Sequence, residues 1–213
     1  MASIVVYGAG GKAGSRIVAE AASRGHSVLA VVRDPTRLRD LPAGVRTAAG
    51  EATSTASLGE RARGSDALVF AIGGADKSVY ARAARAAVEV LTPLGKEGPR
   101  LLHMGGGGSL LNAQGGRFAD APGLPPALVE EMKAQAAALE IYRKSTGVRW
   151  TYVSPPPGIF APGIRTGHYR TGLEHPVVAA DGSMRLSYED FAVAIVDEIE
   201  NGKFIGMRFT VGY

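Results

Sequence analysis

Short apolar runs alternate along the chain with segments whose apolar residues recur at helical spacing. The first run, Ser3–Tyr7, is rich in β-branched residues and ends at a glycine, so it predicts a strand that enters a tight turn. Residues 12–24 then carry alanine, isoleucine and valine on one helix face, and this pattern stops before Gly25. The chain therefore opens with a predicted strand, a glycine-rich turn and a helix.

The same cycle of strand and helix repeats over most of the sequence. Residues 67–72 are apolar at every position, which is typical of a parallel strand that is covered on both faces. Alternation of this kind favours crossover connections and a mainly parallel sheet with helices on both sides. We predict one doubly wound α/β domain over residues 1–213. The predicted strands cover residues 3–7, 28–32, 45–48, 66–72, 100–104 and 149–153, and the predicted helices cover 12–24, 55–63, 78–91 and 126–145, with a helical turn at 34–38 and a helix start at 187–190.

Two long segments interrupt the alternation, at about 105–125 and 154–186. Both begin at the carboxyl end of a predicted strand, which is where open parallel sheets bind ligands. Long irregular loops in compact domains are commonly functional. We therefore predict that both segments are ordered substrate loops.

Composition narrows the class of protein. The absence of cysteine excludes a disulfide scaffold, a thiolate zinc site and a cysteine nucleophile, and four scattered histidines predict no metal site. The net charge of +4 is spread along the chain without a block of like charges, so no nucleic-acid groove is indicated. No window approaches the roughly 20 apolar residues of a membrane span, and a strand from residue 3 leaves no room for a signal peptide. We expect a cytoplasmic monomer or homodimer that acts on a small molecule.

Glycines cluster in the first turn, which reads Gly-Ala-Gly-Gly-Lys-Ala-Gly from Gly8 to Gly14. A turn between a strand and a helix needs residues without a β-carbon where its backbone approaches a pyrophosphate, and the helix amino end supplies free N–H groups. Gly14, one turn into the helix, would let helix and strand pack closely. The predicted contacts of a dinucleotide with this turn are Gly8, Gly10, Gly11, Lys12 and Ala13.

The second predicted strand ends in Arg33 and Asp34. An acidic residue about 20 positions after the glycines binds the ribose of NAD, whereas an arginine there accommodates the 2′-phosphate of NADP. Arg33 stands at the strand end itself, so NADP(H) is favoured over NAD(H), and the adjacent Asp34 keeps NAD(H) open. Glu51 could bind the adenine amino group. Further cofactor contacts are predicted at later strand ends, namely at Ala71, Ile72, Gly73, Met104, Gly105 and Pro155.

Several motifs together resemble one known group. They are the opening turn, the Val-Arg-Asp of residues 32–34, the loop from Gly105 to Leu110, the Pro-Gly-Ile-Arg-Thr-Gly of residues 162–167 and the ending 208–213. The chain resembles the atypical short-chain dehydrogenases of the NAD(P)H-binding, NmrA-like kind, specifically the NADH-flavin-reductase-like and biliverdin-reductase-B-like branch. The resemblance implies a Rossmann domain, a pyridine nucleotide, and hydride transfer to flavins or other flat conjugated acceptors. One departure is Gly10, where the group usually has threonine.

The pair Tyr-x-x-x-Lys of classical short-chain reductases is absent, since none of the seven tyrosines is followed by lysine four residues later. This disfavours a simple ketoreductase. Hydride transfer to a flavin depends on orientation rather than on a strong protein acid, so it fits the absence. Candidate catalytic residues are Ser109, Lys133 and Tyr169, although Ser109 could equally cap its loop and Lys133 could face solvent. Candidate substrate-binding residues are Gly106, Phe160, Arg165, His168 and Tyr169.

Two other functions fit the same pattern. One is a tailoring reductase of secondary metabolism, or a cyclase or isomerase that runs without net redox change. The other is a regulator that senses NADP(H) and catalyses nothing, because a fold by itself does not fix a function.

Overall fold

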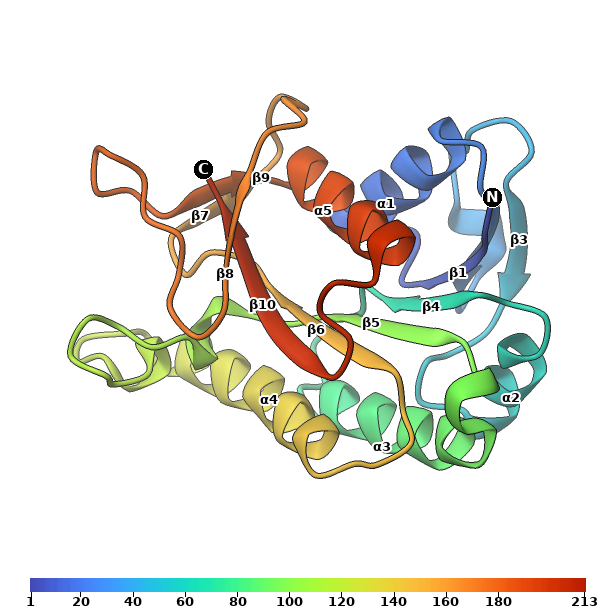
Figure 1. The fold of residues 1–213 in the computed structure, drawn as a ribbon, viewed down its shortest axis with the longest axis horizontal. Coiled ribbons are helices and arrows are strands. Elements are labelled where there is room, and N and C mark those ends of the chain that lie inside the picture. Colours follow the sequence, from blue (N-terminus) through green and yellow to red (C-terminus); the bar gives the residue numbers. More distant parts are fainter.

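An eight-stranded sheet forms the centre of the computed structural model, which describes residues 1–213 (Figure 1). Its strands lie in the order β3-β2-β1-β4-β5-β6-β10-β8, and all neighbours are parallel except β10 and β8. The strands are β1 (Ser3–Tyr7), β2 (Ser27–Val32), β3 (Arg46–Ala49), β4 (Ala67–Phe70), β5 (Arg100–Met104), β6 (Trp150–Ser154), β8 (Arg170–Gly172) and β10 (Met207–Gly212). The order 3-2-1-4-5-6 is that of a doubly wound Rossmann fold. The fold class predicted from the alternation is confirmed.

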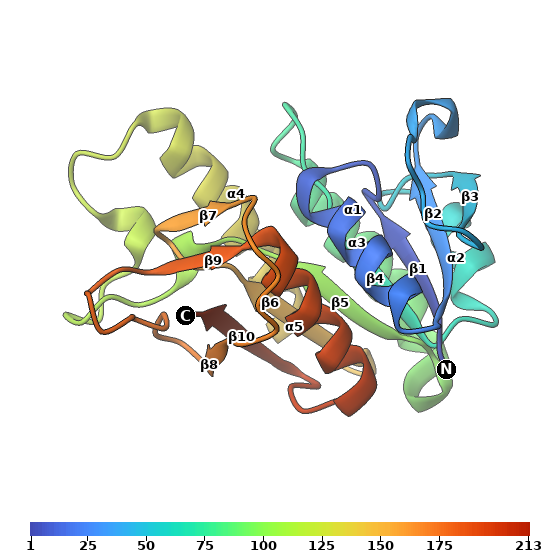
Figure 2. The ribbon, with the colours of Figure 1, turned by 90° about the horizontal axis from the view of Figure 1, so that it is seen from above.

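Five α-helices cover the two faces of this sheet (Figure 2). The helices α1 (Lys12–Ser23) and α5 (Tyr188–Asn201) pack against each other on one face. The opposite face carries α2 (Thr55–Ala62), α3 (Val79–Leu91) and α4 (Pro126–Arg143). Helices α1 to α4 match the predicted ones within about two residues, because each carries apolar residues at helical spacing, whereas for α5 only the start was predicted.

The apolar strands explain why the core has two layers. In β1, Ile4 and Val6 point to the face of α1 and α5, whereas Val5 and Tyr7 point to the face of α2 and α3. Successive side chains of a strand alternate between faces, so a strand covered on both sides must be apolar throughout. Each fully buried side chain of this kind contributes roughly 1.5–3 kcal/mol.

The segment 154–186 is more regular than expected. It contains β7 (Ile159–Ala161) and leads into β9 (Arg185–Ser187), which together form a small parallel sheet beside the main one, and it also contains β8. The prediction of an irregular segment was wrong at these strands, since strands of three residues carry too few positions to show an alternating pattern. None of the helices combines the length and apolar character that crossing a bilayer requires.

Candidate nucleotide-binding site

The turn after β1 is fixed by close backbone contacts. Gly8 has a positive φ of 79° and donates its N–H to the carbonyl oxygen of Val31 at 3.1 Å. A Cβ at Gly8 would collide with the carbonyl of Ala71 at the end of β4, and a Cβ at Gly14 would collide with the carbonyl of Gly8. Glycine is therefore required at both positions, and the helix can lie directly against the turn.

The amino end of α1 is open toward solvent. Its N-cap residue is Gly11, which offers no side chain, and no acidic residue stands in the first turn. Gly10, Gly11 and Lys12 are exposed, and the Lys12 ammonium makes no hydrogen bond or ion pair within the protein, whereas Ala13 is buried below them. Free N–H groups and the positive end of the helix dipole make this end an anion site. The residues present therefore fit the diphosphate of a dinucleotide.

The loop after β2 presents a free guanidinium beside this turn. Arg33 is exposed and its side chain makes no hydrogen bond or ion pair. Asp34 caps the following turn, because its Oδ1 atom accepts hydrogen bonds from the backbone N–H and the hydroxyl of Thr36 at 3.1 and 2.6 Å, while its Oδ2 atom is free. Leu38 approaches Gly10, whose Cβ would lie 3.3 Å from its methyl group. Arg33 therefore offers all its donors to a ligand here, whereas Asp34 offers one carboxylate oxygen.

The remaining predicted cofactor residues of the first half lie at neighbouring strand ends. Glu51 follows β3 and is exposed, and its carboxylate accepts a hydrogen bond of 3.4 Å from the Thr53 hydroxyl. Ala71, Ile72 and Gly73 follow β4 directly, and the Ala71 carbonyl borders the Gly8 turn. The topology thus places all of these residues at the carboxyl edge of the sheet, where the strand order reverses.

The glycine run after β5 is packed against other parts of the protein. All four residues from Gly105 to Gly108 are buried. Added Cβ atoms would meet, in order, the Tyr152 ring, the Gln135 amide, the backbone of Pro157 and the Met132 side chain. Met104 is the last residue of β5, and Pro155 lies buried one residue after β6. This run of glycines is therefore explained by close packing, whereas a role at a ligand remains a prediction.

The three catalytic candidates lie in three different environments. Ser109 is buried, and its Oγ accepts a hydrogen bond of 3.3 Å from the Arg208 guanidinium. Lys133 is exposed and lines a groove between α3 and α4. Tyr169 lies beside α5 and donates its hydroxyl proton to the Asp197 carboxylate at 2.5 Å. The structure does not bring these residues together, and their catalytic roles stay predictions.

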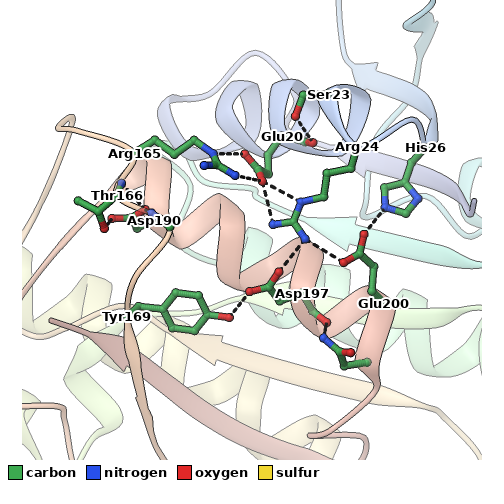
Figure 3. Close-up of polar contacts among 12 residues, drawn as sticks. Glu20, Ser23, Arg24, His26, Arg165, Thr166, Tyr169, Asp190, Asp197 and Glu200 are labelled. Carbon is green, nitrogen blue, oxygen red and sulfur yellow. Dashed lines mark hydrogen bonds and ion pairs between the residues drawn. The ribbon is translucent and has the colours of Figure 1, made fainter.

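Arg165 and Tyr169 contact the two helices α1 and α5 rather than the glycine turn (Figure 3). The Arg165 guanidinium donates to both oxygens of Glu20 at 2.7 and 2.8 Å. The hydrogen bond from Arg165 lowers the pKa of Glu20, against the effect of burial, and the Arg24 guanidinium lowers it further. Burial, together with the hydrogen bond to Asp197, raises the pKa of Tyr169. His168 is exposed and lines a polar pocket of about 420 Å³ with Tyr169.

The segment 162–170, which we call the strap, is held by the bond from Arg165 to Glu20 and also by Asp190 near the start of α5. The buried carboxylate of Asp190 accepts hydrogen bonds from the Thr166 hydroxyl at 2.6 Å, from the Gly167 N–H at 2.8 Å and from the Tyr213 hydroxyl at 2.6 Å. Burial acts to raise the pKa of Asp190, but these hydrogen bonds lower it overall. Phe160 on β7 packs edge-on against Tyr188 and Phe191. The strap and the carboxyl terminus are thereby tied to one helix.

One polar cluster at the carboxyl edge of the sheet was not predicted from the sequence. The Glu131 carboxylate on α4 accepts hydrogen bonds from the Tyr80 hydroxyl on α3 and from the Gln135 amide nitrogen at 3.2 Å, and it forms an ion pair with Lys77. Burial of Tyr80 and its hydrogen bond to Glu131 raise the pKa of the Tyr80 hydroxyl to about 12. Glu131 and Gln135 are spaced i, i+4 on a helix, which was a usable signal, but Tyr80 comes from a distant segment.

Comparison with known proteins agrees with this geometry. The sequence profile described as NAD(P)H-binding matches residues 8–201. The chain belongs to the NAD(P)H-binding family. The protein YwnB of Bacillus subtilis, whose function is uncharacterised, is 32% identical over 212 residues, which cover 98% of this chain and 97% of YwnB.

Two solved structures are similar to this chain over its whole length. SP1627 of Streptococcus pneumoniae, described as "a putative NADH-flavin reductase", is 28% identical with a TM-score of 0.86 and covers 100% of this chain and 99% of its own. A protein of Bacteroides thetaiotaomicron, described as a "putative epimerase", is 32% identical with a TM-score of 0.86 and covers 100% of this chain and 97% of its own. The family assignment fits the open end of α1, because NAD(P)H carries a diphosphate of the kind that such a helix end can bind.

Proposed function

We propose that the protein is an NADPH-dependent reductase of a flavin or a similar flat conjugated acceptor. The observation that carries the proposal is the open amino end of α1 beside the free Arg33 guanidinium. The end of α1 would hold the diphosphate and Arg33 the 2′-phosphate, because guanidinium donors match phosphate oxygens in pairs. When bound, NADPH supplies the hydride.

The acid–base groups at the carboxyl edge favour an acceptor that needs no strong protein acid. The Tyr80 hydroxyl lies 3.3 Å from the position of a Cβ at Gly73, but it donates its proton to Glu131 and has a pKa of about 12. It is therefore a weak acid whose only proton is engaged. A conjugated ring accepts hydride and delocalises the resulting charge, so orientation over the cofactor is the main requirement. The similarity to SP1627 supports the same class of acceptor.

The test is oxidation of NADPH by the purified protein, followed by absorbance, with lumiflavin, FMN and menadione as separate acceptors. We expect turnover with at least one of them and slower turnover when NADH replaces NADPH. No turnover with any acceptor would refute the reductase function.

The second candidate is a reaction without net redox change, which the similarity to a protein described as an epimerase supports. In that case the protein would bind NADPH tightly and would convert its substrate without lasting consumption of NADPH. Product formation at constant NADPH absorbance would identify it.

A further inference from the structure

The cluster of Glu131, Tyr80, Gln135 and Lys77 contacts the loop that follows β4 and the loop that follows β5. Tyr80 reaches Gly73 after β4, and the Oε1 atom of Gln135 occupies the space in which a Cβ of Gly106 would lie. Gly73 and Gly106 stand at the carboxyl edge of the sheet, the edge that also carries the open turn after β1. The cluster therefore borders the region in which the ring systems of the cofactor and acceptor would meet.

Hydrogen bonding fixes which way the Gln135 amide points. Its nitrogen donates to Glu131 at 3.2 Å, and a carboxylate can only accept, so the amide oxygen must face the other way. That oxygen, beside Gly106, has no hydrogen-bond partner in the protein. Lys77 and Tyr80 bind the same carboxylate from α3 and its preceding loop, which holds Glu131 in place. The result is an oriented acceptor atom without a donor.

The helix that carries Gln135 is itself firmly placed at this point. The Tyr152 hydroxyl on β6 donates to the backbone carbonyl of Gln135 at 2.8 Å. Its ring fills the space beside Gly105, and Met132 fills the space beside Gly108. These contacts fix the backbone of α4 at Gln135, and the hydrogen bond to Glu131 fixes the Gln135 side chain. Together they hold Oε1 beside the glycine loop.

We propose that Gln135 is a specificity-determining residue, whose Oε1 accepts a hydrogen bond from a ring N–H of the acceptor, and that Glu131 is the positioning residue that orients its amide. This inference rests on the proposed function and narrows its substrate class to flat conjugated rings with an imide or lactam N–H. A ring that carries only carbonyl oxygens, such as a quinone, offers no donor and would leave Oε1 unpaired.

The test compares lumiflavin, which has a ring imide N–H, with N3-methyl-lumiflavin, which lacks it. Binding of each flavin to the NADP⁺-loaded protein is measured by quenching of flavin fluorescence, which needs no turnover. Wild-type protein is expected to bind lumiflavin about tenfold more tightly than the methylated form. In Gln135→Met, which keeps the length but removes the acceptor, the ratio should fall to about one.

Two further variants separate orientation from folding. Glu131→Gln lets the Gln135 amide adopt either orientation, so the ratio should fall partway while the melting temperature is followed as a check on folding. Glu130→Gln is the matched control, because Glu130 is exposed and forms no ion pair, and it should keep the wild-type ratio. Turnover of menadione with NADPH should stay within about twofold in the control Glu130→Gln, which lies outside the cluster.

The outcomes distinguish this inference from the proposed function. An unchanged ratio in Gln135→Met, equal affinities in the wild type, or binding of neither flavin would overturn the role of Gln135, even if menadione is reduced. Discrimination that depends on Gln135 without any NADPH oxidation would support the role of Gln135 and refute the reductase function.

Discussion

The glycine-rich loops after β1 and β5 look alike in sequence but differ in their surroundings. In the first, Gly10 and Gly11 are exposed and lead into a helix end without a cap. In the second, every glycine from 105 to 108 is buried against a side chain or backbone of the same chain. The first loop keeps its backbone accessible for a ligand, whereas the second uses glycine to let α4 and β6 approach.

Five charged and polar candidates divide in the same way between the two regions, whereas Lys133 and the His168 side chain in the second half are exposed and have no partner. Lys12 and Arg33, near the first loop, have no partner for their side chains. Arg165, Tyr169 and Ser109, in the second half, are bound to Glu20, Asp197 and Arg208. Substitutions in the first region should therefore weaken nucleotide binding, and substitutions in the second should lower stability.

The largest expected effect is that of Gly105→Ala on stability. The new methyl group would collide with the buried Tyr152 ring, and overpacking of this kind destabilises by about 3 kcal/mol. Urea denaturation measures the change in unfolding free energy. Gly74→Ala is the control, since Gly74 is exposed with no atom near its Cβ position, and it should change little. Equal effects of the two substitutions would contradict the packing role.

Gly11→Asp should weaken nucleotide binding and leave stability nearly unchanged. The aspartate would cap the free N–H groups of α1 and repel a diphosphate, so the Kd for NADPH should rise about 30-fold. The free protein should melt close to the wild-type temperature, because an N-cap aspartate gains only a few tenths of a kcal/mol over glycine and its Cβ would lie 3.2 Å from the Gly8 carbonyl oxygen. Calorimetric titration and thermal melting measure the two effects. Gly11→Asn adds the same Cβ without charge and should weaken binding less; equal Kd values for Gly11→Asp and wild type would count against an anion site.

Glu20→Gln tests the strap and should act on stability alone. Loss of the charged hydrogen bonds to Arg165 and Arg24 should lower the unfolding free energy by about 2 kcal/mol at neutral pH. The pKa of Glu20 is lower in the folded protein, so its contribution is present above the unfolded pKa of about 4.3 and is lost as pH falls through the folded pKa. The difference between variant and wild type should therefore shrink below about pH 4. A constant difference down to acid pH, or a weaker affinity for NADPH, would show that Glu20 acts otherwise.

The sequence predicted β1 to β6 of the central sheet, because most of these strands are largely apolar, and it predicted the helices between them from their apolar faces. It did not predict β7, β8 and β9, whose pairing is decided by tertiary contacts such as those between residues 159–161 and 185–187. It also did not predict β10, although residues 208–213 contribute to the family resemblance. The short strands are partly exposed, so hydrophobic periodicity cannot mark them.

The candidate site was predictable in its first half and only partly in its second. The turn from Gly8 to Gly14 and the end of β2 are contiguous motifs whose geometry follows from the strand–turn–helix order. The cluster of Tyr80, Glu131 and Gln135 joins two helices that are some fifty residues apart, and its members look like ordinary helix residues. Likewise, Arg165 and Tyr169 gave no sign in sequence that Glu20 and Asp197 would bind them.

The most direct test of the account is a calorimetric comparison of NADPH and NADH with wild-type protein and Arg33→Ser. The claim is that the end of α1 binds the diphosphate and that Arg33 binds the 2′-phosphate. Wild type should bind NADPH more tightly than NADH, and Arg33→Ser should lose about tenfold in affinity for NADPH with no change for NADH. Equal affinities of the wild type for both nucleotides, or no binding of either, would contradict the claim.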